Sequence, residues 1–175
     1  KLAEAVKGLA VGDGFEEGAK IGPLIEPAAL EKVEEHVADA TRRGAEVILG
    51  GRRHAKGGLF FEPTVMTGVP ADALVSSEET FGPVAPLFRF RDDEEALRLA
   101  NDTQFGLASY FYARDLGRVW TVAEALESGI VGVNTGIIST EVAPFGGVKQ
   151  SGLGREGSKY GIEEFVEIKY VCLGF

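Results

Sequence analysis

Apolar residues recur at intervals of three and four across residues 27–43, with charged residues between them. The apolar positions are Leu30, Val33, Val37 and Ala40. This spacing predicts an amphipathic helix, and Gly44, which follows it, is a typical helix stop. The β-branched run at residues 45–49 comes next. A helix followed directly by a strand indicates an α/β protein.

The alternation of strands and helices continues to residue 134. Apolar, β-branched or aromatic runs predict strands at residues 60–69, 84–90, 108–113 and 130–133, the last of them suited to burial on both faces. Four acidic residues at 92–95 open a helix that runs to Ala100. Acidic residues in a first turn suit the helix dipole, so this charged run needs no ligand to explain it. Asp115 is the expected cap of a helix that ends at Gly129 and places Trp120 in the core.

Residues 135–160 are different, being rich in glycine and almost without periodicity. Long loops inside compact domains are usually functional, so we expect a site in this block. Residues 163–175 alternate enough to predict a terminal strand. The side chains available for pairing on that strand are Phe165, Ile168, Tyr170 and Cys172.

Composition narrows the class of protein. Eighteen basic against 27 acidic residues give a net charge of −9 over 175 residues, and 45% of the residues are apolar. This is a globular composition with one sizeable core. The basic residues are scattered, so nucleic acid is not an expected partner, and no uncharged apolar run approaches the roughly 20 residues of a membrane span.

The single cysteine indicates the compartment in which the protein is expected. The first residues indicate whether the chain is a whole protein or a fragment. One cysteine, Cys172, permits no intrachain disulfide, which favours a reducing compartment and makes the cytoplasm the expected location. The chain begins with Lys1, and residues 1–9 have the pattern of a helix already in progress rather than of a signal peptide. We therefore expect a fragment of a longer protein.

Three features suggest chemistry but have plainer explanations. Gly152, Gly154 and Gly157 spell G-x-G-x-x-G, yet a dinucleotide fingerprint needs a strand before it and an acidic residue about 20 positions after it, beyond the end of this chain. Cys172 has no activating neighbour in sequence and is expected to be a small packing residue. Neither of the two histidines has metal-ligand spacing, so structural or surface roles are expected and no metal site is predicted.

Two segments carry candidate binding chemistry. In the first, a Gly-Pro pair fixes a turn directly after Glu79 and Phe81, so that a carboxylate and a ring can face one ligand. A carboxylate that accepts two ribose hydroxyls beside an aromatic ring suits a nucleoside. A solvated pair of acids before a strand is the alternative. The second segment, residues 144–152, is either a functional loop or a mobile glycine loop.

Taken in order along the chain, several motifs resemble the C-terminal part of the aldehyde dehydrogenase superfamily. They are E-T-F-G-P at 79–83, Asn101 with F-G-L-A at 105–108, G-V-N at 132–134, and P-F-G-G at 144–147 with Lys149, Ser151-Gly152 and G-R-E at 154–156. Residues 137–170 and the early segment GDGFEEGAKIGPLI are similar to succinate-semialdehyde dehydrogenases. The resemblance covers essentially the whole chain.

The resemblance implies a fold and a domain organisation. The fold is α/β, a fragment of the Rossmann-like catalytic domain of the aldehyde dehydrogenase fold. Residues 1–162 are then the C-terminal part of the catalytic domain, including the glycine-rich loop 135–160. Residues 163–175 are a terminal oligomerisation strand that pairs with another subunit in a homodimer or homotetramer.

The resemblance also implies an enzyme that oxidises succinate semialdehyde to succinate with NAD or NADP. In this family a cysteine thiolate attacks the aldehyde, a hydride passes to the cofactor, and a glutamate-activated water releases the acid. That cysteine and that glutamate are expected N-terminal to this segment, so no catalytic residue is assigned within the chain. A dehydrogenase for another short carboxylated aldehyde, such as glutarate semialdehyde, and a non-catalytic assembly module remain the alternatives.

Four binding residues follow from the resemblance. Glu79 holds the nicotinamide ribose, and Phe81 flanks the nicotinamide. Ser139 and Phe145 line the substrate tunnel. Relatives that act on apolar aldehydes tend to carry an aromatic ring where Ser139 stands, whereas the serine helps to bind a substrate carboxylate. An ordinary loop serine is the alternative.

Overall fold

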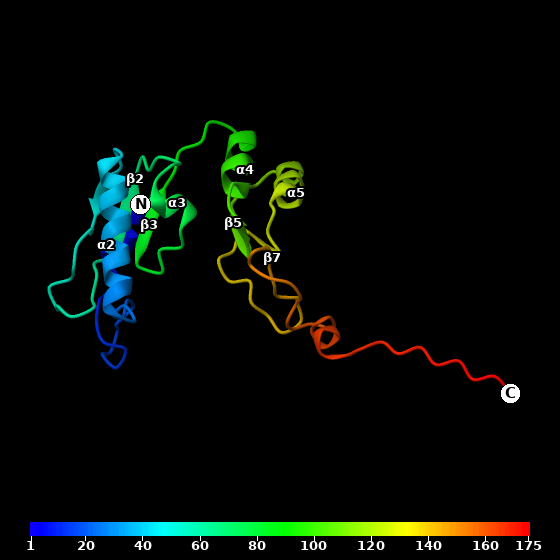
Figure 1. Ribbon diagram of the computed structural model, residues 1–175. Helices are drawn as coiled ribbons and strands as arrows, with labels where there is room; N and C mark the ends of the chain where they lie inside the picture. The colour runs from blue at the N-terminus through cyan, green and yellow to red at the C-terminus, as the bar shows by residue number, and fades with distance from the viewer. The chain divides into compact units, whose positions relative to one another are not determined.

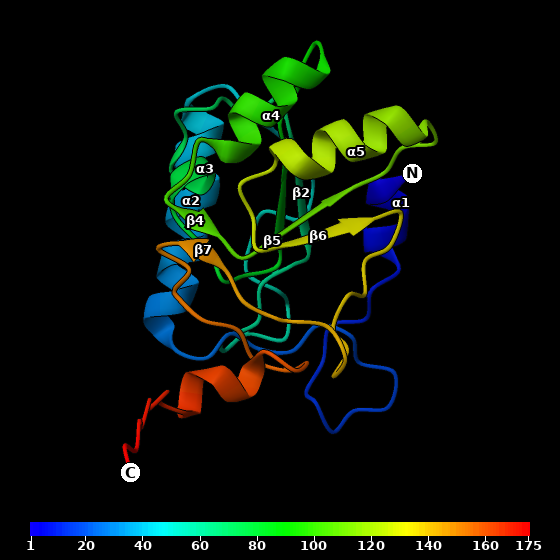
Figure 2. The ribbon, with the colours of Figure 1, turned by 90° about the vertical axis from the view of Figure 1, so that its right-hand side faces the viewer.

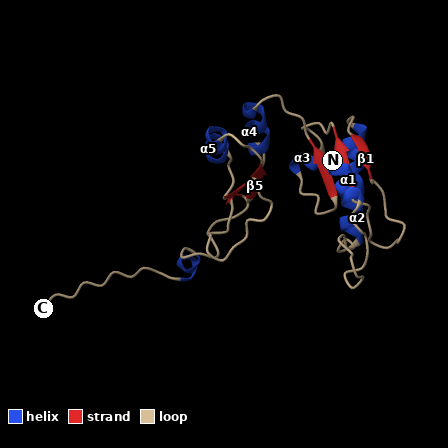
Figure 3. Cartoon of the chain, turned by 180° about the vertical axis from the view of Figure 1, so that it is seen from behind, coloured by secondary structure: helices blue, strands red, loops and turns tan.

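The computed structural model describes residues 1–175, which form two compact units, Lys1–Phe90 and Arg91–Phe175. The first unit contains a three-stranded sheet of β1 (Glu46–Leu49), β2 (Thr64–Thr67) and β3 (Val84–Leu87), in that order. Strand β2 runs antiparallel to β1 and parallel to β3. Helix α2 (Pro27–Arg42) lies on one face of this sheet and α1 (Leu2–Lys7) on the other (Figures 1 and 3). A short helix, α3 (Leu74–Ser77), lies between β2 and β3 in the chain.

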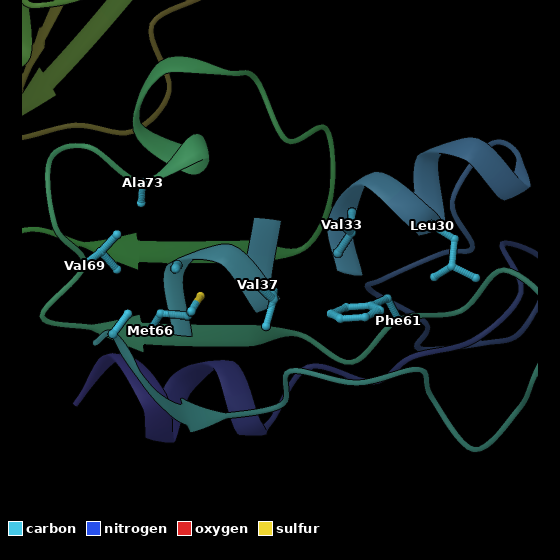
Figure 4. Close-up of a cluster of buried hydrophobic side chains, with 9 residues drawn as sticks. Leu30, Val33, Val37, Phe61, Met66, Val69 and Ala73 are labelled. Carbon is cyan, nitrogen blue, oxygen red and sulfur yellow. The ribbon is translucent and has the colours of Figure 1, made fainter. Parts of the chain in front are cut away.

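The core of the first unit lies between α2 and the sheet (Figure 4). The helix contributes the apolar residues that its spacing placed on one face, namely Leu30, Val33, Val37 and Ala40, all of them buried. They pack in one cluster with Phe61, Met66, Val69 and Ala73. Full burial of each large apolar side chain stabilises a fold by roughly 1.5–3 kcal/mol, so this cluster is the main source of stability in the unit.

One carboxylate is buried beside this core. Asp39 on α2 is 6% exposed and accepts hydrogen bonds from the backbone N–H of Leu74, at 2.9 Å, and from Nε of Arg43, at 3.0 Å. These bonds, first that of Leu74 and then that of Arg43, hold the pKa of Asp39 below its usual value. The bond to Leu74 fastens the start of α3 to α2.

We expect Asp39 to stabilise the folded chain at neutral pH and to lose this effect in acid. Because folding lowers its pKa, the contribution is complete above the unfolded-state pKa of about 4 and disappears as the pH falls through the folded-state pKa. Asp39→Asn should therefore lower the melting temperature at neutral pH and flatten its fall below about pH 5. Thermal melts of both proteins across this range test the link, and parallel pH curves would contradict it.

The second unit contains two strand pairs. Strands β5 (Ala108–Phe111) and β6 (Ile130–Val133) are parallel and are connected through α5 (Leu116–Ala125), while β4 (Phe105–Gly106) pairs antiparallel with β7 (Val148–Lys149). Helices α4 (Asp93–Asn101) and α5 both lie above the β5–β6 pair in Figures 1 and 2. The side chains of Asp92 and Asp115 cap these helices by accepting hydrogen bonds from backbone N–H groups three residues on.

The predicted alternation of strands and helices is confirmed, with shorter elements. Strands β1, β2, β3, β5 and β6 lie within the five predicted strands, and α1, α2 and α4 form where expected. Helix α5 ends at Ala125 instead of Gly129. In β6 only Gly132 is buried, so the expected burial of this strand on both faces is not observed in the chain. None of the helices has both the length and the apolar character needed to cross a bilayer.

The prediction that Trp120 lies in the core is wrong for this chain. Its side chain is 62% exposed. The inward face of α5 is instead formed by Val119, Val122 and Ala123, which are partly buried and follow the three-and-four spacing of a helix face. Trp120 lies beside this stripe, where nothing in the unit covers it.

Residues 163–175, predicted to form a terminal strand that pairs with another subunit, form no strand within the single chain. The first of these residues belong to the 3₁₀ helix η1 (Gly161–Phe165), in which the Glu163 N–H donates to the Tyr160 carbonyl. The residues after η1 form no helix or strand and run as an extended chain (Figure 1). A strand needs a neighbouring edge for its hydrogen bonds, and no edge of this chain pairs with the segment. Cys172 is exposed on it, so its expected packing role is not observed.

Candidate cofactor and substrate site

The turn that carries Glu79 and Phe81 lies between α3 and β3 in the first unit. Phe81 has φ of 47°, a left-handed conformation that is uncommon for a residue with a side chain. Gly82, next to it, lies so close to α2 that a Cβ there would overlap Cγ2 of Val33. The backbone of the turn therefore packs against α2. Both candidate side chains, Glu79 and Phe81, are exposed, and Phe81 is 77% exposed.

A buried histidine of α2 also contacts this turn. His36 is 1% exposed, and its Nδ1 lies 2.9 Å from Oγ1 of Thr80. Its Nε2 lies 3.4 Å from a carboxylate oxygen of Glu78. The imidazole thus meets the residues on both sides of Glu79 and leaves the Glu79 carboxylate free for a ligand. The structural role expected for the histidine is confirmed, but its link to the candidate site was not predicted.

The glycine-rich block of the second unit is a loop with several internal hydrogen bonds. Phe145 and Glu156 exchange two backbone hydrogen bonds, at 2.9 and 2.8 Å, and the Ser158 N–H donates to the Glu141 carbonyl. The guanidinium of Arg155 donates to the carbonyls of Gly147 and Gly154 at 2.8 and 2.7 Å. These bonds join the two halves of the loop, so the mobile-loop alternative is not supported.

Ser139 and Phe145 lie together in this loop. Both line an open pocket of about 510 Å³, whose other lining residues are Thr140, Glu141, Glu156 and Gly157. Ser139 is exposed and Phe145 partly buried. The pocket offers hydroxyl groups and an aromatic ring, but its charged residues are acidic. No cationic side chain lines the pocket.

The G-x-G-x-x-G motif lies within the loop of the second unit. Gly152, Gly154 and Gly157 all have positive φ, at 114°, 83° and 69°, so the glycines serve the loop's conformation. No helix starts directly after them, which agrees with the rejection of a dinucleotide fingerprint. No group of three or more His, Cys, Asp or Glu side chains is arranged to hold a metal ion.

Comparison with known proteins assigns the family. Residues 1–171 match the aldehyde dehydrogenase family. The chain belongs to this family. It is 65% identical over 174 residues to the NADP(+) succinate-semialdehyde dehydrogenase GabD of Escherichia coli strain K12, and 64% identical over 174 residues to a glutarate-semialdehyde dehydrogenase of Pseudomonas aeruginosa. Each alignment covers 99% of this chain and 36% of the relative.

Solved structures of this aldehyde dehydrogenase family support the fold. A crystal structure of succinate-semialdehyde dehydrogenase from Burkholderia pseudomallei is 67% identical, with a TM-score of 0.96 over 98% of this chain and 36% of that one. Betaine aldehyde dehydrogenase from Staphylococcus aureus, solved in complex with NAD+, is 39% identical, with a TM-score of 0.87 over 94% of this chain and 33% of that one. The mixed α/β architecture is thus that of aldehyde dehydrogenases. The comparisons do not support the expected C-terminal placement, which rests on the motifs alone.

Proposed function

We propose that the chain is a segment of an NAD(P)-dependent dehydrogenase that oxidises succinate semialdehyde to succinate. The observation that carries the substrate class is the pocket shared by Ser139 and Phe145. A hydroxyl beside an aromatic ring suits a short aldehyde with a polar far end. The identity of the chain to succinate- and glutarate-semialdehyde dehydrogenases, 65% and 64%, supports the same class.

The turn at Glu79 and Phe81 fits a nicotinamide cofactor. An exposed carboxylate without an internal partner can accept hydrogen bonds from both hydroxyls of a ribose, and charged acceptors make the stronger bonds. The exposed ring of Phe81, held in a fixed backbone conformation, can flank a planar base. The bound cofactor supplies the acceptor for the hydride that leaves the substrate. In this assignment Glu79 and Phe81 orient the acceptor and do no bond chemistry themselves.

The groups that make and break bonds are assigned outside these 175 residues. The family reaction requires a cysteine thiolate that adds to the aldehyde carbon, and a glutamate that activates the water which later releases the acid. Cys172 is exposed and has no hydrogen-bond or ion-pair partner in the chain, so it does not fit the first role. The cation that binds the substrate carboxylate is likewise assigned to another part of the enzyme.

The length of the substrate is the open choice within this proposal. Glutarate semialdehyde is one methylene longer than succinate semialdehyde, and one methylene changes binding by only about 1–3 kcal/mol. Comparing kcat/KM of the intact enzyme for the two aldehydes separates these candidates. A preference for the longer aldehyde would replace the proposed substrate and keep the reaction class.

Replacement of Ser139 tests whether this residue recognises the substrate carboxylate. Ser139→Phe in the intact enzyme removes a hydroxyl donor and fills the space beside it. Succinate semialdehyde should lose kcat/KM by about tenfold, equivalent to about 1.4 kcal/mol, whereas an apolar aldehyde of similar length should lose much less. Steady-state kinetics with both aldehydes measure the ratio. Ser139→Ala separates the hydrogen bond from the bulk, and equal losses for both aldehydes in both variants would leave Ser139 only a role in shaping the loop.

We also propose that the segment after η1 pairs with another subunit. Its backbone is extended and unpaired in the chain, and Ile168 and Tyr170 are 99% and 86% exposed. The unpaired backbone N–H and C=O groups of an extended segment can form hydrogen bonds with the sheet edge of a partner. Deletion of residues 166–175 from the intact enzyme, which leaves η1 in place, should dissociate its oligomer. Light scattering measures the mass, and an unchanged mass would contradict the pairing.

A further inference from the structure

The residues from Glu79 to Phe81 have almost no hydrogen bonds of their own. On one side of them the Glu78 N–H donates to the Leu74 carbonyl, and on the other the Val84 N–H donates to the Gly82 carbonyl. Between these bonds, residues 79–81 make one hydrogen bond within the chain, between the hydroxyl of Thr80 and Nδ1 of His36. At its two ends the turn is held by the contact of Glu78 with His36 and by the bond from the Thr64 N–H to the Pro83 carbonyl. Between these ends, its position depends on the contact of Thr80 with His36 and on the packing of Gly82 against Val33.

The backbone conformation makes this contact important. Phe81 occupies the left-handed region, which is less favourable than the common conformations for any residue with a Cβ. Such a conformation persists when the surrounding structure fixes it. If Thr80 is released, Phe81 can relax toward a commoner conformation, and the ring of Phe81 and the carboxylate of Glu79 move together.

His36 is suited to fix the turn because it cannot exchange its partners for water. The imidazole is 1% exposed, within the buried face of α2. In the neutral tautomer with hydrogen on Nε2, which faces the Glu78 carboxylate at 3.4 Å, Nδ1 accepts the hydrogen bond from Thr80. A buried nitrogen without a partner is unfavourable, so the imidazole favours the turn conformation that brings Thr80 to it.

We propose that His36 is a positioning residue for the nicotinamide cofactor, acting through Thr80 on the turn that presents Glu79 and Phe81. This inference rests on the proposed cofactor role of that turn. It assigns a function to a residue that touches neither cofactor nor substrate and lies 44 positions from Thr80 in the sequence. Loss of the contact should weaken cofactor binding and leave aldehyde binding unchanged.

The first test uses threonine substitutions in the full-length enzyme. Thr80→Val keeps the shape of the side chain and removes the hydroxyl, so the KM for NAD(P)+ should rise about three- to tenfold while the KM for the aldehyde stays constant. Thr80→Ser keeps the hydroxyl and should remain within about twofold of the wild type. Thr41→Val is the matched control, because the Thr41 hydroxyl bonds the Val37 carbonyl of the same helix and does not contact the turn.

The second test separates the two nitrogens of His36. The amide of asparagine can occupy the position of Nδ1, near Thr80, whereas that of glutamine reaches the position of Nε2, near Glu78. Both substitutions reduce the packing of the core. His36→Gln should therefore raise the KM for NAD(P)+ more than His36→Asn does, whatever the melting temperatures of the two variants. Equal cofactor KM values for these variants would indicate only a packing role for His36 and would overturn the proposal.

Glu79→Gln distinguishes the two ways in which the idea can fail. If Glu79→Gln slows hydride transfer while Thr80→Val has the wild-type KM for cofactor, the turn binds the cofactor and the positioning role of His36 is wrong. If Glu79→Gln leaves the rate of hydride transfer unchanged, the proposed cofactor site is wrong. The positioning role of His36 is then wrong as well, because it depends on that site. If Thr80→Val raises the KM for the cofactor and Thr80→Ser keeps it near the wild-type value, both the cofactor site and the positioning role of His36 are supported.

Discussion

Purified alone, the 175-residue chain is expected to form no NAD(P)H from succinate semialdehyde. The reaction needs a thiolate beside the aldehyde and a base that activates water. The only cysteine, Cys172, is exposed on the extended segment after η1 and has no hydrogen-bond or ion-pair partner. In a hydrolase that uses covalent catalysis, removal of the nucleophile lowers kcat by about 10⁶, so the expected loss here amounts to complete inactivity.

Aldehyde-dependent formation of NAD(P)H, measured for the chain and for the full-length gene product in parallel, checks this expectation. Cys172→Ser in the chain is the control, because it removes the one thiol and alters an exposed position. Turnover by the chain above the rate of this control would contradict the assignment of the catalytic groups to other parts of the enzyme. If the chain is inactive and the full-length protein is active, the chain is a segment of an enzyme. The alternative of a non-catalytic assembly module is then excluded for the full-length protein.

Elements set by local spacing could be predicted from the sequence. The apolar residues of α2 at Leu30, Val33 and Val37 define a helix face, and Gly44 ends the helix with φ of 105°, a conformation that favours glycine. The alternation of strand and helix indicates the βαβ arrangement that a parallel pair requires, and β5 and β6 form such a pair. Which strands pair within a sheet depends on contacts that a local pattern does not contain.

Features set by distant partners could not be predicted. Trp120 lies one position from the inward stripe of α5, and a spacing pattern does not separate two adjacent faces of a helix. The segment after η1 has a strand-like sequence, yet a strand forms only where another edge supplies its hydrogen bonds. The contact between His36 and Thr80 depends on how α2 packs against the turn, to which no local pattern points.

The two candidate binding segments, one in each unit, also differ in how far the sequence predicts them. The Gly-Pro pair indicated that Glu79 and Phe81 share a fixed turn, and the structure holds both in that turn with their side chains exposed. Only the resemblance to a family assigned Ser139 and Phe145 to one pocket. They are six positions apart in a loop, and this separation does not predict whether their side chains line the same pocket. The backbone bonds between Phe145 and Glu156 bring the two ends of that pocket together, and composition does not encode such bonds.

Replacement of Glu79 by glutamine in the intact enzyme should slow hydride transfer by roughly ten- to 150-fold. Glutamine keeps the size of the side chain and one acceptor oxygen, but it loses the charge. A hydrogen bond to a charged group contributes about 1.5–3 kcal/mol, and each 1.36 kcal/mol changes a rate about tenfold. Because the turn holds Glu79 exposed and without an internal partner, no other contact of the protein should compensate for the loss.

Single-turnover kinetics, with enzyme in excess over the aldehyde, isolate this step from product release. Glu17→Gln is the matched control, because Glu17 is an exposed glutamate of the same unit without a hydrogen bond or ion pair in the chain. It should leave the rate unchanged. A wild-type rate of hydride transfer in Glu79→Gln would remove Glu79 from the cofactor site. A slower rate in Glu79→Gln alone would show that the charge at this position of the turn, and not the net charge of the unit, orients the nicotinamide.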